Sequence, residues 1–249
     1  MLELLREKNL DKFINEYSEK SLEDVLKDTL EFNSYRNYHK IDSMGNISTK
    51  KLNMPLVSLT FFGKEELENY FTKGLYITEK RKTHKIDRLS QYDVSHLEKN
   101  LYKVFYNRDL SIAYRYAKEF IFKDKELFIK KLSHFVLLDE IKSEKAIITL
   151  AFIKALEKVN KENVDVFLYS YLPYIVTYPS HICPLDNKEI IKIDKENLDL
   201  RALSYLNLIA YGYEDYEEKY LRKLSSYIKD MYFKEEEIKL MNMLKESAK

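Results

Sequence analysis

Residues 143–157, "SEKAIITLAFIKALE", are a strongly apolar stretch that decides the class of fold. The polar start at Ser143 is followed by apolar residues on more than one face of a helix, which is typical of a helix that is buried on several sides. We therefore expect this helix to be the most buried one, through Ile147, Ile148, Leu150, Ala151, Ile153, Ala155 and Leu156.

Three helices are predicted ahead of it, each introduced by a polar residue. Ser95–Glu98, "SHLE", is a capping-box pattern, in which the serine oxygen accepts from an early helix N–H. Asp109 and Asp124 can cap the next two helices. Apolar spacings of three and four give each helix one buried face. The residues expected there are Leu97, Leu101, Val104 and Phe105; Ile112, Ala113, Tyr116, Phe120 and Ile121; and Leu127, Phe128, Leu132, Phe135 and Leu138.

The helical pattern continues toward the carboxyl end. A helix from Val164 is expected to stop near Pro173, because proline removes a helix hydrogen bond. After a proline-rich connection the pattern resumes over Leu198–Tyr211, and Gly212 stands where a helix would end. The residues predicted to face the core there are Leu200, Leu203, Leu206, Leu208 and Ile209, and the last two helices are predicted over Tyr216–Asp230 and Lys234–Lys245.

The short connections between these helices favour antiparallel neighbours. We predict an all-α protein in which residues 94–249 form an irregular array of antiparallel helix pairs, either HEAT-like or an orthogonal bundle. Residues 1–93 are less regular, with helices over Leu2–Tyr17 and Ser21–Tyr35 and a short β-hairpin or extended connection within residues 39–63. Because this portion holds little core of its own, we expect a single domain over residues 1–249.

The composition excludes several classes of protein. The formal net charge is +1, so no global field attracts nucleic acid or an anionic membrane. A single cysteine cannot form an intrachain disulfide, and no run approaches the roughly 18 apolar residues of a membrane-spanning helix. The amino terminus lacks the apolar core of a signal peptide. We expect a cytoplasmic protein with no membrane partner.

No recognisable catalytic motif is present: the sequence has no glycine-rich phosphate loop, Cys-x-x-Cys pair, HExxH or Gly-x-Ser-x-Gly pattern. The histidines are scattered singly, so we expect no metal site and no cofactor. For His39, His96 and His134 a surface or hydrogen-bonded structural role is expected.

Rare residues gather in the loop over residues 178–189, which contains Tyr178, His181, Cys183 and Asp186. His181 and Cys183 are two residues apart, so in an extended segment their side chains point to opposite faces. Cys183 is therefore expected to be a small buried hydrophobe. The connection is long, and long ordered loops are often functional, so Tyr178, His181 and Asp186 remain candidate binding residues. A hydrolase-like enzyme that uses this loop stays open as an alternative.

Residues 80–88 form a basic loop, which can contact phosphates while neighbouring tyrosines stack on bases. Acidic residues dilute it, so a solvated loop is the competing interpretation and nucleic-acid binding a second alternative. The basic residues are Lys80, Arg81, Lys82, Lys85 and Arg88.

Residues 211–220, "YGYEDYEEKY", combine tyrosines and acids in a loop and helix start. The acids complement the helix dipole, which is an ordinary structural role. Exposed tyrosines among them would also suit a basic protein partner. The candidate binding residues are Tyr211, Tyr213, Glu214, Asp215, Tyr216, Glu217 and Glu218.

These patterns favour a binding protein over an enzyme. Arrays of helix pairs present long side surfaces that suit protein partners. The expected function is protein–protein interaction, either as an adaptor or as a cytoplasmic neutraliser of another protein, such as a bacterial immunity protein paired with a toxin.

Overall fold

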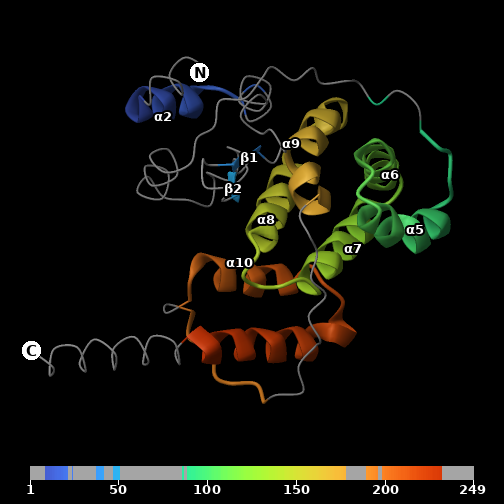
Figure 1. Cartoon of the computed structure of the whole chain (residues 1–249). Helices are drawn as coiled ribbons and strands as arrows, with labels where there is room; N and C mark the ends of the chain where they lie inside the picture. Colours follow the sequence, from blue (N-terminus) through green and yellow to red (C-terminus); the bar gives the residue numbers. More distant parts are fainter. Residues whose placement is uncertain are drawn as a thin grey trace, which may run out of the picture. The chain divides into compact units, whose positions relative to one another are not determined.

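The computed structural model is mostly helical, which confirms the predicted all-α class (Figure 1). No helix within the described part of the chain is both long and apolar enough to cross a membrane. The structure describes residues 9–21, 24, 38–41, 47–50, 86, 89–177, 189–195 and 198–231.

The chain divides into two compact units, and each is described by itself. Two helices, α7 (Lys125–Leu137) and α8 (Lys145–Leu156), contribute residues to both. The single domain expected over residues 1–249 stays a prediction. Unit 1 consists of Met1–Ile129 and Ile148–Pro179, and unit 2 of Lys130–Ile147 and Ser180–Lys249.

The amino-terminal part of unit 1 contains a helix and a small sheet. Helix α2 (Leu10–Glu19) begins after Asn9, whose side chain accepts a hydrogen bond from Lys12 N at 3.3 Å. Strands β1 (Tyr38–Ile41) and β2 (Ile47–Lys50) pair antiparallel. The predicted hairpin itself stays a prediction, because the residues between the strands lie outside the described ones. The same holds for the helix predicted over Lys234–Lys245.

Helices α5 (Val94–Tyr106) and α6 (Leu110–Lys123) follow in unit 1. Asp109 caps α6 as predicted. The cap of α5 was predicted two residues too late: the Asp93 carboxylate accepts from His96 N at 2.7 Å, so the helix begins before Ser95. The residues expected in the core are buried except Ile112, which is 37% exposed, whereas its neighbour Ala113 is fully buried.

The apolar stretch around Ser143 forms α8, and every residue that was expected to be buried there is buried. Ahead of it, the Asp124 carboxylate accepts from Leu127 N at 2.9 Å and caps α7 as predicted. After a short 3-10 helix, η3 (Lys161–Asn163), helix α9 runs over Val164–Thr177. The predicted stop near Pro173 was wrong. Burial of the residues that follow it, Tyr174, Ile175 and Val176, outweighs the hydrogen bond that proline loses.

Aromatic side chains join four helices of unit 1. Phe120 of α6 meets Phe128 of α7 edge to face, with ring centroids 5.8 Å apart. Phe128 meets Phe152 of α8 at 6.4 Å, and Phe152 meets Tyr171 of α9 at 5.4 Å. All four rings are buried. This series forms the centre of the unit 1 core, and α6 packs directly on α5 and α9.

Unit 2 contains α10 (Leu200–Ile209), the 3-10 helix η5 (Glu214–Tyr216) and a further helix over residues 217–231. The Asp199 carboxylate caps α10, accepting from Ala202 N at 2.7 Å. The predicted core face of α10 was partly wrong, because Leu200, Leu203 and Leu206 are only half-buried. A tyrosine and two small residues are buried in their place. The buried residues of α10 are Ala202, Ser204, Tyr205, Leu208 and Ile209.

A buried polar cluster lies at the carboxyl end of α7. The Leu137 carbonyl accepts from the Tyr205 hydroxyl at 2.8 Å and from Lys223 Nζ at 3.0 Å, and Lys223 also donates to the Asp139 carbonyl at 2.5 Å. Lys145 Nζ lies 2.6 Å from the Asp139 carboxylate, and both side chains are 2% exposed. Lys223 thus donates to carbonyls that the end of α7 leaves without helical partners. Lys145 balances the charge of the buried Asp139 carboxylate.

Candidate functional site

The segment over residues 211–218 follows α10, contains η5 and ends in the first turn of the helix over residues 217–231. Its four acidic side chains, Glu214, Asp215, Glu217 and Glu218, are exposed. Its three tyrosines are half-buried rather than exposed as the sequence suggested. Removal of the apolar ring area from water is favourable, so the tyrosine rings pack against the protein.

Two of these tyrosines, Tyr213 and Tyr216, pack on His134 of α7 together with Tyr220. The Tyr220 hydroxyl is in hydrogen-bond contact with His134 Nδ1. The ring centroid of His134 is 5.1 Å from that of Tyr213 and 4.9 Å from that of Tyr216, and both pairs meet edge to face. We call His134, Tyr213, Tyr216 and Tyr220 the histidine–tyrosine cluster. Its contacts hold the acidic segment, residues 211–218, against α7.

Lysines of the same chain cover the tyrosine faces of this cluster. Lys130 Nζ lies 5.0 Å and Lys131 Nζ 5.4 Å from the ring centroid of Tyr213. Lys219 Nζ lies 4.6 Å from the ring centroid of Tyr216. These are cation–π distances. The ring faces of Tyr213 and Tyr216 thus have lysines of this chain over them, whereas the four carboxylates of the segment are exposed.

Burial controls the protonation of the cluster. It lowers the pKa of His134 to about 4, and the charge of Lys131 adds to the effect. Burial also raises the pKa of Tyr220 well above its ordinary value. The imidazole and phenol are therefore both neutral at pH 7. This arrangement suits a structural hydrogen bond rather than a general base that must accept a proton near neutral pH.

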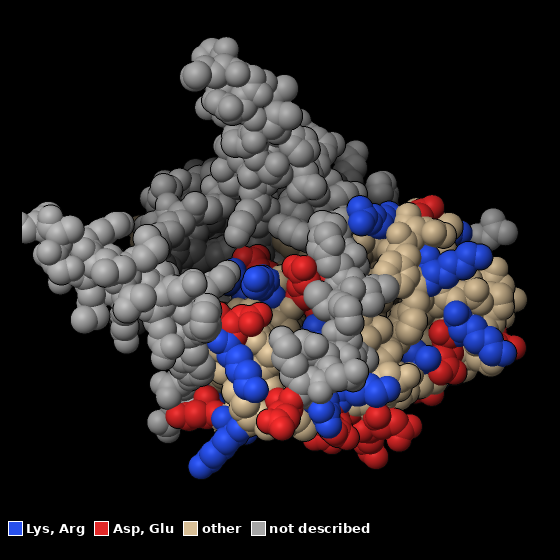
Figure 2. Space-filling model, turned by 60° about the horizontal axis from the view of Figure 1, so that its bottom comes forward, with Lys and Arg blue, Asp and Glu red and all other residues tan. Residues whose placement is uncertain are grey.

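Charged side chains of both signs are interspersed on the face drawn in Figure 2. Among the described residues of this face, neither sign of charge dominates. Within the part of the chain that the structure describes, no group of three or more His, Cys, Asp or Glu side chains could hold a metal ion.

The comparisons add no relative. No family model, curated protein or solved structure matches this chain.

Two predicted sites lie outside the described residues. The first is the loop over residues 178–189, where the binding role of Tyr178, His181 and Asp186 and the burial of Cys183 remain predictions. The second is the basic loop, whose residues Lys80, Arg81, Lys82, Lys85 and Arg88 remain predicted nucleic-acid contacts.

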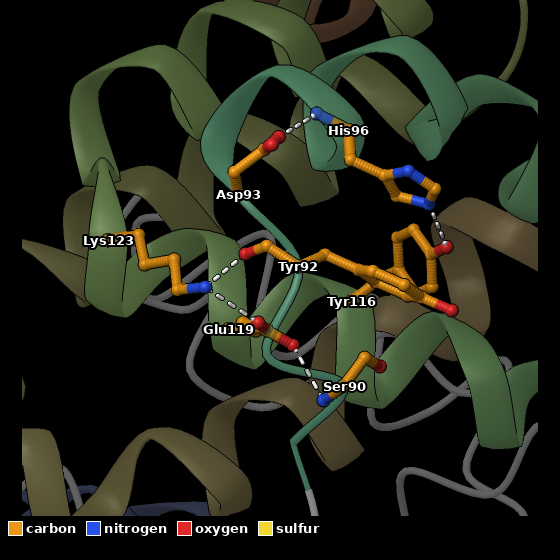
Figure 3. A network of polar contacts seen from close by, with 7 residues as sticks. All are labelled: Ser90, Tyr92, Asp93, His96, Tyr116, Glu119 and Lys123. Atoms are coloured by element: carbon orange, nitrogen blue, oxygen red, sulfur yellow. Dashed lines mark hydrogen bonds and ion pairs between the residues drawn. The ribbon is translucent and has the colours of Figure 1, made fainter.

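A polar network that the sequence did not reveal lies at the start of α5 (Figure 3). The Glu119 carboxylate, which is buried, accepts from Ser90 N at 2.8 Å and from Lys123 Nζ at 2.9 Å. Lys123 also donates to the Tyr92 carbonyl. The Tyr92 ring stacks on His96 with centroids 4.0 Å apart.

The same network continues to Ile86. Its N–H donates to Asp165 Oδ2 at 3.1 Å, and its carbonyl accepts from Lys118 Nζ at 2.8 Å. Lys118 and Asp165 form an ion pair at 2.9 Å. The Glu119–Lys123 spacing of four residues is the one sequence signal for this network, and it is too common on helices to identify a site.

Protonation of His134 gives a testable pH dependence. Its pKa is near 6.5 in an unfolded chain and about 4 in the folded one, so the unfolded state binds the proton first as the pH falls. Its stabilising contribution is complete above pH 6.5 and is lost between pH 6.5 and 4. After allowance for solvent screening at this half-buried site, the loss is about 1–2 kcal/mol.

The measurement compares urea unfolding of the wild type and of His134→Gln at pH 7 and pH 4.5. Glutamine can still accept from the Tyr220 hydroxyl but does not titrate. The wild type is expected to lose more stability between these pH values than the variant. Equal losses in both proteins would contradict the assignment.

Proposed function

We propose that this protein is a non-catalytic module that binds another protein through the acidic segment over residues 211–218. One observation carries the proposal: four exposed carboxylates stand on a backbone that the histidine–tyrosine cluster fixes in place. Of these, Glu218 is already paired with Arg222 at 2.5 Å, which leaves Glu214, Asp215 and Glu217 as the main contact groups.

A fixed backbone favours binding because little conformational entropy is lost when a partner docks. Exposed carboxylates select a partner with a basic surface and accelerate its association. The tyrosines contribute by positioning the segment, since their faces carry this chain's own lysines. The expected partner is therefore a protein with a lysine- or arginine-rich patch.

We also propose the arrangement of helices and the cellular location that were predicted from the sequence. The helices would form an irregular array of antiparallel pairs, HEAT-like or orthogonal, whose side surface presents the acidic segment. The role would be that of a cytoplasmic adaptor or of an immunity-type neutraliser in a bacterial cell. The helical class and the chemistry of the segment support this proposal.

Charge reversal tests this proposal. The triple variant Glu214→Lys, Asp215→Lys and Glu217→Lys should capture less of a partner from lysate of the source organism than the wild type does. The matched control is Glu162→Lys, an exposed acid of η3. Each eluate is quantified by mass spectrometry, and binding of a recovered partner should weaken as salt rises.

The expected result is at least one partner that the wild type and the control retain and the triple variant loses. A partner set that is unchanged by charge reversal would overturn the proposed surface. Turnover in a hydrolase screen, with no partner lost, would favour the enzyme alternative.

A further inference from the structure

A segment of unit 1 is held in the way that a bound peptide is held. We call Ile86 together with residues 89–93 the strap. Its main chain makes four hydrogen bonds with side chains of α6 and α9, through the N–H and carbonyl of Ile86, the N–H of Ser90 and the carbonyl of Tyr92. The Tyr92 ring adds a side-chain contact with Tyr116 of α6. Main-chain recognition of an extended segment, with a buried side chain as anchor, is a recurring mode of peptide binding.

The side chains that hold the strap are paired with one another. Lys118 lies 2.9 Å from the Asp165 carboxylate, and Lys123 lies 2.9 Å from the Glu119 carboxylate. If the strap leaves, each carboxylate keeps its cation, so opening leaves no buried charge without a partner. The loss consists of hydrogen bonds that water can replace, of the ring contacts of Tyr92 with His96 and Tyr116, and of the burial of the Ile86 side chain, which is 7% exposed.

The strap also contains a backbone conformation that its sequence does not favour. Gln91 has φ 60, in the left-handed region that residues with a Cβ seldom adopt. Such a conformation persists only where surrounding contacts impose it, and these positions concentrate at switch regions. The neighbouring Tyr92 is 39% exposed although it stacks on His96. The strap is thus bound at its ends and strained between them.

We propose that Lys118, Glu119 and Lys123 of α6 and Asp165 of α9 form a binding site for an extended peptide, which the strap occupies in cis. A partner's peptide with an aliphatic residue at the position of Ile86 binds there when the strap leaves. This site goes beyond the acidic segment of the proposed function and does not depend on it.

The test uses the full-length chain and a fluorescein-labelled peptide, HKIDRLSQYD, which copies residues 84–93. Binding is followed by fluorescence anisotropy. The variant Ser90→Pro removes the N–H that donates to Glu119 and so loosens the strap without changing α6 or α9. It should bind the peptide about tenfold or more tightly than the wild type, in which the strap competes at a high effective concentration.

Two controls isolate the site. A peptide that is N-methylated at the position of Ile86 cannot donate to Asp165 and should lose its affinity for the Ser90→Pro chain. The variant Ile112→Ser, at an exposed residue of the same helix, should bind like the wild type. Equal affinity of the wild type and Ser90→Pro, or full binding of the methylated peptide, would overturn the proposal.

Hydrogen exchange on the unmodified protein gives an independent check. The amide of Ser90 should exchange much faster than the amides in the centre of α6, because the strap opens without unfolding the helices. If that amide exchanges only as slowly as the centre of α6, the strap does not open locally and the proposal fails.

Discussion

Replacing Lys145 with methionine is expected to lower the free energy of unfolding by about 3–5 kcal/mol, because it leaves a buried carboxylate without its cation. Lys145 Nζ is 2.6 Å from Asp139 Oδ2, and both side chains are 2% exposed. The Asp139 carboxylate also accepts a hydrogen bond from Glu140 N at 2.9 Å, which does not replace the charge of Lys145. Urea unfolding measured by circular dichroism gives the change directly.

A matched control is available on the same helix. Lys154 pairs with Glu157 at 3.9 Å, but the two side chains are 47% and 46% exposed. Lys154→Met should therefore change the free energy of unfolding by less than about 1 kcal/mol. The double variant Asp139→Leu and Lys145→Met should recover much of the loss, because removal of both charges leaves neither of them unpaired.

Similar effects of Lys145→Met and Lys154→Met would show that water reaches the Asp139–Lys145 pair. If the double variant is as unstable as Lys145→Met, the loss of stability comes from a contact other than the Asp139–Lys145 ion pair. The remaining candidate is Lys223, which donates to the Leu137 and Asp139 carbonyls at the end of α7.

Local chemistry accounts for what the sequence predicted well. Asp109 and Asp124 cap their helices because an aspartate that is followed by an apolar helical pattern can satisfy the first N–H groups without any tertiary partner. The helix after Ser143 was predicted to be deeply buried from its apolar residues alone, and it is. Such features depend on residues within one or two turns of each other.

The errors arise where tertiary packing outweighs local preference. Pro173 does not end α9, because the residues after it are buried in the unit 1 core. In α10 the buried face centres on Tyr205, whose hydroxyl donates to the Leu137 carbonyl across 68 residues of sequence. A count of leucines cannot anticipate a partner that distant. Ser95 was chosen as a cap because its pattern resembled a capping box, although Asp93 stood two residues earlier.

The candidate sites were harder to predict than the helices. The acidic segment was visible as a cluster of charges, but its tyrosines were expected to be exposed and are half-buried, with Tyr213 and Tyr216 packed against His134. His134 gave no signal, because its partners are about 80 residues away or more. The residues that hold the strap, such as Lys118 and Glu119, look in the sequence like ordinary surface charges of α6.

Replacing Phe152 with alanine is expected to lower the free energy of unfolding by about 3–5 kcal/mol, since it removes the ring that joins Phe128 of α7 to Tyr171 of α9. The surrounding rings are fully buried, so the cavity cannot collapse easily. The matched control is Phe122→Ala on α6, where the ring is 37% exposed and carries Lys118 Nζ 5.7 Å from its centroid. That change should cost about 1 kcal/mol or less.

Urea unfolding of the two variants distinguishes a packed aromatic core from a loose one. Equal losses in Phe152→Ala and Phe122→Ala would contradict the central place of Phe152. The comparison also bears on the strap, because α6 and α9 supply all four side chains that hold it and Phe152 packs between the rings of α7 and α9. Phe152→Ala should therefore speed amide exchange at Ser90 as well as in α9, whereas Phe122→Ala should leave α9 protected.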